Sequence, residues 1–172
     1  MEQIGREAGL SRITVYRHVG AKDEVFRQVV LRNSRRYYAL LESDFARADS
    51  LRDVVHAVFS RAQANYRGNE WYQTLLELEP ETILRMLTTD ATGFYVQGVP
   101  FLVPHLKRYL NTARRAEIAA EWIVRVTISM VGTSGHLLDP YDAADLERLL
   151  TLTIDGIAGL DRVSGRRARV TR

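Results

Sequence analysis

The sequence lacks cysteine, carries only four prolines, and contains no long uncharged apolar run in its 172 residues. Without cysteine, the chain cannot form disulfides, thiolate nucleophiles, iron–sulfur clusters or cysteine-based zinc sites. Its most apolar stretch, around 116–138, is interrupted by Glu117, Glu121 and Arg125, so we expect no membrane-spanning helix. The opening residues also lack the apolar core of a signal peptide. These features favour an intracellular, cytoplasmic protein.

Motifs of the common enzyme classes are missing as well. There is no Gly-x-Ser-x-Gly elbow, P-loop or dinucleotide fingerprint. The histidines are scattered without metal-ligand spacing, at positions 18, 56, 105 and 136. The acidic cluster Glu77, Glu79 and Glu81 lies beside Pro80 and is expected to face solvent rather than to perform acid–base chemistry. We therefore expect no catalytic residues, no metal and no cofactor, and a small helical enzyme is the weakest of three hypotheses.

Charge is distributed unevenly along the chain. Residues 1–36 carry eight basic and four acidic side chains, whereas 162–172 carry five arginines and no acid. The segment 37–161 holds eleven basic and seventeen acidic residues and is therefore net negative. This pattern suggests that a polyanion meets one part of the molecule only, although solvated faces and a frayed terminus would also explain basic ends.

Helical periodicity dominates and no alternating strand pattern occurs, so the sequence predicts an all-α fold. We expect a long helix over about 22–47, another opened by a capping box at Ser50 and Asp53, and helices after Asn69 and Pro80. Over 91–110, Gly98 and Pro100 predict a broken helix. The last two helices are expected over about 113–137 and 143–160, the second capped by Asp142.

Residues 4–19 read as a helix, a glycine-containing turn and a second helix, which is the helix-turn-helix arrangement. Gly9 suits the turn and Ser11 offers an N-cap oxygen for the second helix. A plain helical hairpin would give the same local pattern. The outward side of the second helix would display side chains suited to phosphates and base edges, namely Arg12, Thr14, Tyr16, Arg17 and His18.

The longer pattern resembles the TetR/AcrR family of bacterial transcriptional regulators. The resemblance lies in Ala8-Gly9-Leu10-Ser11, in Thr14-Val15-Tyr16-Arg17-His18-Val19, and in Lys22-Asp23-Glu24 at the start of the long helix. It implies that Ser11 caps the recognition helix, that Arg12, Thr14 and Arg17 face bases or phosphates, and that Tyr16, His18 and Lys22 anchor the DNA backbone. Val19 and Gly20-Ala21 depart from the family pattern, which has phenylalanine and a capping serine there.

The resemblance also implies three parts. These are a partial DNA-binding domain with its connecting helix over 1–46, a ligand-binding and dimerisation domain over 47–161, and a flexible basic tail over 162–172. Family members carry one further helix before the one that begins here. We expect either that the true start lies upstream of Met1 or that the chain is a natural truncation.

Large side chains in the body come from several predicted helices and would suit an apolar cavity, although each could simply belong to the core. The resemblance implies that a small, mostly apolar effector binds there and switches DNA affinity. The expected ligand-binding residues are Phe59, Tyr66, Trp71, Leu75, Met86, Phe94, Tyr95, Phe101 and Trp122.

The helices at 113–137 and 143–160 each carry apolar residues on more than one face, which predicts a homodimer through a four-helix interface. The leading hypothesis is a dimeric one-component regulator, a repressor of a DNA operator that is relieved by a small effector. The second hypothesis is a dimeric small-molecule-binding protein that has lost DNA binding through the N-terminal truncation.

Overall fold

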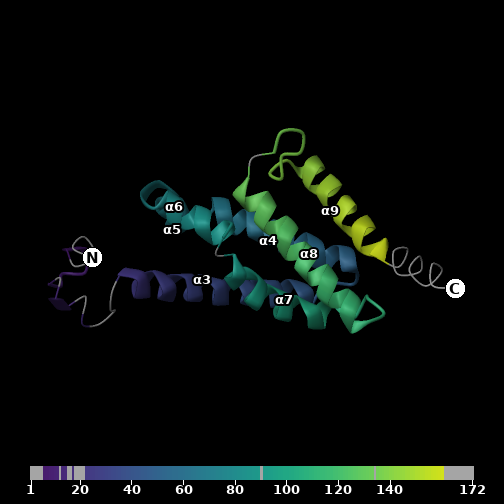
Figure 1. Cartoon of the computed structure of the whole chain (residues 1–172), viewed down its shortest axis with the longest axis horizontal. Coiled ribbons are helices and arrows are strands. Elements are labelled where there is room, and N and C mark those ends of the chain that lie inside the picture. The colour runs from purple at the N-terminus through teal and green to yellow at the C-terminus, as the bar shows by residue number, and fades with distance from the viewer. Residues whose placement is uncertain are drawn as a thin grey trace. The chain divides into compact units, whose positions relative to one another are not determined.

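The computed structural model describes residues 6–11, 13–14, 17, 22–89, 91–133 and 135–160. Within its helices, the side chains of 22–27, 30–31, 71, 75, 78, 86 and 92 lie outside this description. The expected basic tail, 162–172, lies outside it too. The described residues form helices and turns without any strand, so the all-α prediction is confirmed (Figure 1).

Seven helices are bounded within the described residues. In chain order they are α3 (Lys22–Phe45), α4 (Leu51–Arg67), α5 (Glu70–Leu78), α6 (Pro80–Leu87), α7 (Thr92–Leu106), α8 (Ala113–Gly132) and α9 (Ala143–Ala158). Two compact units divide the chain, Met1–Leu40 and Leu41–Arg172. We call the first the head and the second the body. The predicted division lay after residue 46, whereas here the last turn of α3 belongs to the body, because Leu41 and Phe45 are buried there.

Helix starts in the body follow local capping chemistry. The Ser50 hydroxyl accepts from the Asp53 N–H at 3.2 Å, and the Asp53 carboxylate accepts from the Ser50 N–H at 2.9 Å, so the predicted capping box is confirmed. Asp142 caps α9 by accepting from the N–H groups of Ala144 and Asp145. Thr112 caps α8 in the same way through the Arg115 N–H.

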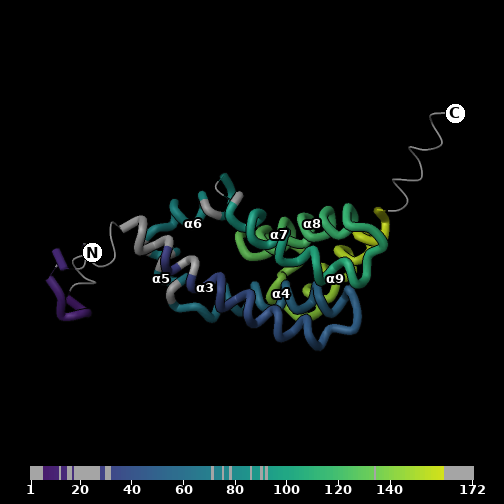
Figure 2. The backbone as a smooth tube through the Cα atoms, turned by 90° about the horizontal axis from the view of Figure 1, so that it is seen from below, coloured from purple at the N-terminus to yellow at the C-terminus, as the bar shows by residue number. Residues whose placement is uncertain are grey.

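Helix α4 is the central element of the body core. It contacts α5, α7, α8 and α9, and its inward face is apolar. The buried residues of that face are Val54, Val55, Val58, Phe59 and Ala62. Helices α7 and α8 lie side by side and make the most extensive contact of the body (Figure 2). The core thus lies between α4 and α8, and α7 and α9 each pack against both of these helices.

The predicted break near Gly98 and Pro100 is wrong. Helix α7 continues through this segment and ends only at Leu106. Pro100 and Pro104 each remove one backbone donor from the helical ladder. The packing of α7 along α8 compensates for these losses, and Leu102 and Leu106 are buried within it. Tertiary packing therefore overrides the local breaking signal.

Helix α8 ends earlier than predicted, at Gly132 rather than at Leu137. Thr133 is extended, with φ −134° and ψ 142°, and both its N–H and its hydroxyl donate to the Ser129 carbonyl. These two bonds satisfy the end of the helix and turn the chain away from it. The residues after α8 are thereby free to form a separate wall, described below.

Candidate functional site

The head contains the turn that the sequence predicts between two helical segments. Gly9 has a φ of 64°, in the left-handed region that glycine adopts without strain, and its N–H donates to the Arg6 carbonyl at 3.2 Å. The Ser11 hydroxyl accepts from the Thr14 N–H at 3.1 Å and also bonds to the Thr14 hydroxyl at 2.8 Å. These are the bonds expected of an N-cap, and helical backbone is described at residues 13–14.

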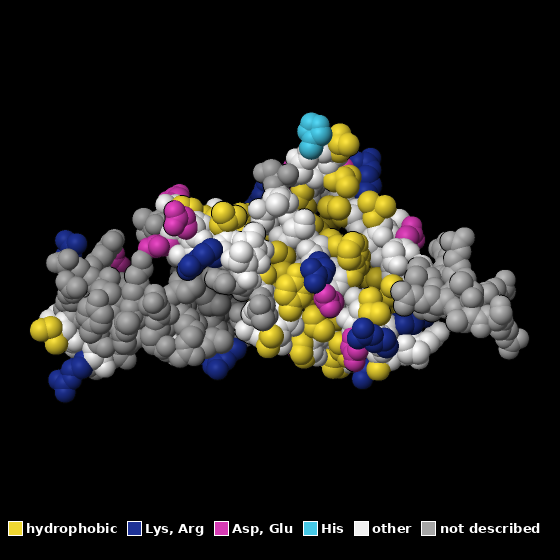
Figure 3. Space-filling view, in the orientation of Figure 1, with side chains coloured by type: hydrophobic (Ala, Val, Ile, Leu, Met, Phe, Trp, Pro, Cys, Tyr) yellow, Lys and Arg dark blue, Asp and Glu magenta, His cyan; other side chains and the backbone are white. Residues whose placement is uncertain are grey.

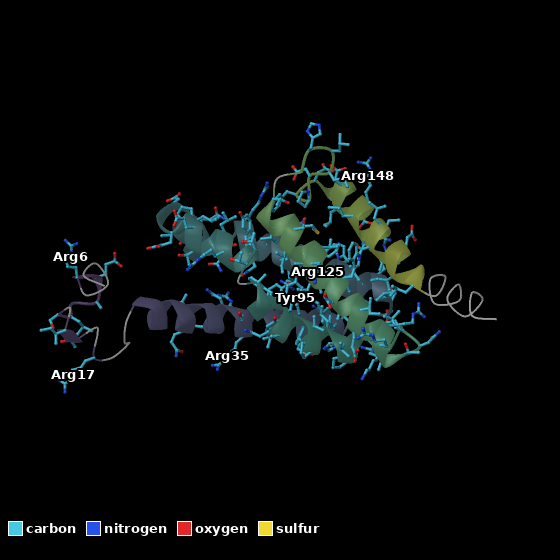
Figure 4. All side chains as sticks on the ribbon, viewed as in Figure 1. Arg6, Arg17, Arg35, Tyr95, Arg125 and Arg148 are labelled. Atoms are coloured by element: carbon cyan, nitrogen blue, oxygen red, sulfur yellow. The ribbon has the colours of Figure 1, made fainter. Side chains whose placement is uncertain are left out.

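Only part of the predicted DNA-binding set is described. Ser11 and Arg17 are exposed and Thr14 is half-buried. Figure 4 shows Arg6 and Arg17 projecting from the head into solvent. Arg12, Tyr16 and His18 lie outside the described residues, and Lys22 opens α3 with its side chain outside the description. The proposed roles of these four residues rest on the sequence pattern.

The predicted ligand-binding residues fall into separate places in the body. Phe59 is fully buried in the core on α4. The ring of Phe101 packs against those of Phe45 and His105, at centroid distances of 5.9 and 5.5 Å. Tyr95 lies beside Arg125, and Phe94 is 38% exposed. The side chains of Trp71, Leu75 and Met86 lie outside the description. The two remaining residues, Tyr66 and Trp122, belong to the features described next.

Three tyrosines join α4, α5 and the loop before α9. The ring of Tyr66 lies 4.8 Å from that of Tyr72 and 6.5 Å from that of Tyr141, and the Arg67 guanidinium stacks 3.5 Å over the Tyr141 ring. Burial raises the pKa of Tyr72 and of Tyr141 above the ordinary tyrosine value. The hydroxyls of Tyr72 and Tyr141 therefore stay neutral at physiological pH, and the three rings join these elements by packing against one another.

The segment 135–141 is a structured loop. The Asp139 N–H donates to the Asp145 carboxylate at 3.0 Å, and the Tyr141 N–H donates to the Asp139 carboxylate at 2.9 Å. Gln63 on α4 donates to the Pro140 carbonyl. Residues 139–141 of the loop are thus fixed to α9 and to α4.

Between α8, this loop and α9 lies a groove of about 400 Å³. We call it the α8–α9 groove. Its residues are Trp122, Arg125, Val126, Ser129, Met130, Thr133, Gly135, Leu138, Pro140 and Leu149. Its size falls within the range of small-molecule sites, and most of its lining is apolar. Of the predicted ligand residues whose side chains the structure describes, only Trp122 lines it.

Sequence reasoning missed the other groove residues, yet one signal was present. Arg125, Ser129 and Thr133 follow each other at intervals of four, so they form one polar row along the predicted helix. Such a row marks a face that is neither core nor plain solvent surface. The opposite wall could not be found in this way, because it depends on where the loop folds back.

An exposed apolar strip borders the groove on α8 and α9. Ile118 and Trp122 are 39% and 46% exposed on α8, and Leu152 is 62% exposed on α9. Trp122 and Leu149 both line the groove, and the Trp122 indole nitrogen lies beside Gly156 of α9. The two helices thus present neighbouring parts of one surface, over which hydrophobic side chains gather in Figure 3. We call these four side chains, Ile118, Trp122, Leu149 and Leu152, the apolar strip.

The described residues contain no cluster of three or more histidine, cysteine or acidic side chains able to hold a metal ion. None of the described helices has the length and apolar character that crossing a bilayer requires. The chain matches no protein-family model, no curated protein and no solved structure.

Proposed function

We propose that the chain is a TetR/AcrR-like transcriptional regulator, which binds double-stranded DNA through its head and acts as a repressor relieved by a small effector. The observation that carries the proposal is the geometry at Gly9 and Ser11. A left-handed glycine followed by a serine N-cap stands at the position where the family-like motif requires the turn and the start of the recognition helix.

This geometry supports a DNA-binding role through elementary electrostatics. The N-terminus of a helix carries partial positive charge and favours phosphate. Ser11 sets the start of that helix, and the exposed guanidinium of Arg17 adds a positive charge on the same segment. By the resemblance, Arg12 and Arg17 contact base edges, while Tyr16, His18 and Lys22 hold the backbone.

The apolar strip supports a homodimer as the working form. Monomeric proteins rarely leave a contiguous apolar patch of this kind uncovered. A second copy of the chain would cover it with an identical strip, because a two-fold interface pairs the same surface on both subunits. The four helices of two α8–α9 pairs would then form the interface that the sequence predicts.

DNA binding can be tested by gel shift against the DNA next to the gene, at several salt concentrations. We expect salt-dependent and sequence-selective binding, because counterion release accompanies phosphate contacts. Since the resemblance implies one preceding helix, the chain should also be assayed with the in-frame codons upstream of Met1. If neither form binds selectively, the regulator proposal fails and a binding protein without DNA activity remains.

Substitutions separate the proposed roles. Tyr16→Ala and Lys22→Ala should weaken binding to all sequences, whereas Arg12→Ala and Arg17→Ala should change which bases are preferred. Arg114→Ala is the control, because Arg114 lies on α8 in the body and is exposed. An effect of Arg114→Ala equal to that of Arg17→Ala would mean that only bulk charge matters.

The dimer can be tested by sedimentation of the Leu152→Glu variant. A carboxylate in the middle of a buried interface is costly, so we expect a shift towards monomer. Leu84→Glu is the matched control, because Leu84 on α6 is 60% exposed, close to the 62% of Leu152, and lies outside the apolar strip. Dissociation by both variants, or by neither, would contradict an interface through α8 and α9.

A further inference from the structure

The α8–α9 groove has two chemically distinct rows on its α8 side. Trp122, Val126 and Met130 recur every four residues and form an apolar row. Arg125, Ser129 and Thr133 recur with the same spacing and form the polar row beside it. Eight residues of helix extend about 12 Å, so both rows are long enough to lie along an extended small molecule. Leu138, Pro140 and Leu149 supply an apolar wall opposite.

Among the described residues that line the groove, Arg125 alone is charged. Its Nε and Nη2 atoms both donate to a single oxygen of Glu121, at 3.0 and 2.6 Å. The guanidinium lies 5.0 Å from the ring centroid of Tyr95 (Figure 4). Glu121 and Tyr95 thereby hold the guanidinium in place from two sides. Within the described part of the chain, the Nη1 group makes no hydrogen bond to a protein atom.

We propose that the α8–α9 groove binds a small monocarboxylate with an elongated apolar body. The carboxylate would accept from Nη1 of Arg125, and the apolar body would lie along the row from Trp122 to Met130, against Leu138 and Leu149. Only the identification of this molecule as the effector rests on the proposed function. Binding itself needs neither DNA nor a second subunit.

The lining selects this class of ligand over others. A cationic amphiphile would meet the guanidinium of Arg125, and a sugar or nucleotide would leave most of its polar groups against the apolar walls without partners. A dianionic phosphate would bring two negative charges to a single guanidinium, and Arg125 is already paired with the Glu121 carboxylate. A single carboxylate needs one pair of donors, which Nη1 supplies.

The groove lies at the edge of the proposed dimer interface, so a bound ligand would affect that interface. It opens beside Trp122 and Leu149, which belong to the apolar strip. In the proposed dimer, a molecule in the groove would therefore lie next to the partner subunit. Its carboxylate would also compete with Glu121 for Arg125. A ligand of this kind changes the charge and the packing at the edge of the interface, and so favours one dimer geometry over another.

The test uses decanoate as the probe and 1-decanol as its uncharged counterpart, with calorimetric titration of the full chain in the absence of DNA. We expect saturable binding of decanoate, with 1-decanol binding more weakly. Trp122 fluorescence in a Trp71→Phe background gives a second, local readout, because Trp71 and Trp122 are the two tryptophans of the chain. No saturable binding of decanoate would overturn the proposal.

Three variants locate the site. Arg125→Gln should weaken decanoate binding about tenfold or more and leave 1-decanol unchanged, because it removes a charge-assisted hydrogen bond. Glu121→Gln should strengthen decanoate binding, because the competing charge disappears while an acceptor for Arg125 remains. Ser129→Phe should block both probes by filling the groove. Arg114→Gln is the control, since Arg114 also pairs with an acidic residue on α8, Glu117 at 3.3 Å, but does not line the groove.

Equal binding of decanoate by the original chain and Arg125→Gln would overturn the proposal, as would equal losses in Arg125→Gln and Arg114→Gln. The proposed function is judged separately by the gel shift without decanoate. Decanoate binding without DNA binding would support the groove and overturn the regulator. Selective DNA binding without decanoate binding would support the regulator and overturn the groove as a carboxylate site.

Discussion

Arg61 on α4 donates two hydrogen bonds to Asp44 in the last turn of α3, at 2.6 and 2.9 Å. The two residues form a bidentate pair, in which the Asp44 side chain is 17% exposed. Arg47 adds a third bond to the same carboxylate at 2.9 Å. The last turn of α3 is thus fixed to α4 by this ion pair, beside the buried apolar side chains of Leu41 and Phe45.

The Asp44–Arg61 pair predicts a specific dependence of stability on pH. The hydrogen bond from Arg61 lowers the pKa of Asp44 below its ordinary value of 3.8. The stabilisation is therefore complete above the unfolded pKa and is lost as the pH falls through the lower, folded pKa. Asp44→Asn should be less stable than the original chain at pH 7, and the difference should shrink in strongly acidic solution.

Denaturant unfolding of both chains across this pH range measures the effect. The other acidic groups with lowered pKa values, such as Asp53 and Asp145, are present in both chains and cancel in the comparison. A difference that stays constant down to the lowest pH would show that the charge of Asp44 contributes nothing.

Ser50→Ala should destabilise the body by about 1 kcal/mol, because it removes the N-cap acceptor of α4. The loss reaches the core, since α4 carries the buried face that the other helices pack against. Ser43→Ala is the control, because Ser43 is exposed within α3 and alanine is the better helix former. Thermal unfolding of the two variants should separate them clearly, and similar melting temperatures would contradict the capping role.

Phe59→Ala should cost about 3–5 kcal/mol of folding stability, because the side chain is fully buried on α4. Phe94→Ala should cost much less, because Phe94 is 38% exposed on α7. Both residues were predicted to bind ligand, so the comparison tells a core role from a binding role. If Phe59→Ala kept full stability and lost only ligand binding, the assignment of Phe59 to the core would be wrong.

Gly135→Ala should disrupt the loop that walls the α8–α9 groove. A Cβ atom at this position would lie 1.7 Å from the Leu138 carbonyl oxygen, so the loop must rearrange. We expect lower stability and weaker decanoate binding. Gly93→Ala is the control, because a Cβ there meets nothing within 4 Å and alanine favours the first turn of α7. Unchanged decanoate binding in Gly135→Ala would show that this wall is dispensable.

The sequence by itself determined the helical class and most helix starts. The caps at Ser11, Ser50 and Asp142 could be read directly, because each depends on a bond to a residue two or three positions further on. Pro80 likewise stands in the first turn of α6, where its missing N–H costs nothing. Such signals are local, and distant parts of the chain do not alter them.

The tertiary structure alone decided where the aromatic side chains went and which surface became a groove. Four of the predicted ligand residues lie apart: Phe59 in the core, Phe101 in a ring cluster, Tyr66 in the tyrosine cluster and Trp122 at the groove. Periodicity gives the face of a helix on which a residue lies but not which element packs against that face. The same limit explains α7, whose packing along α8 outweighs two interior prolines. Arg125 faces a groove only because α8 stops at Gly132 and the chain folds back through Leu138 and Pro140, and that contact joins residues that no local pattern connects.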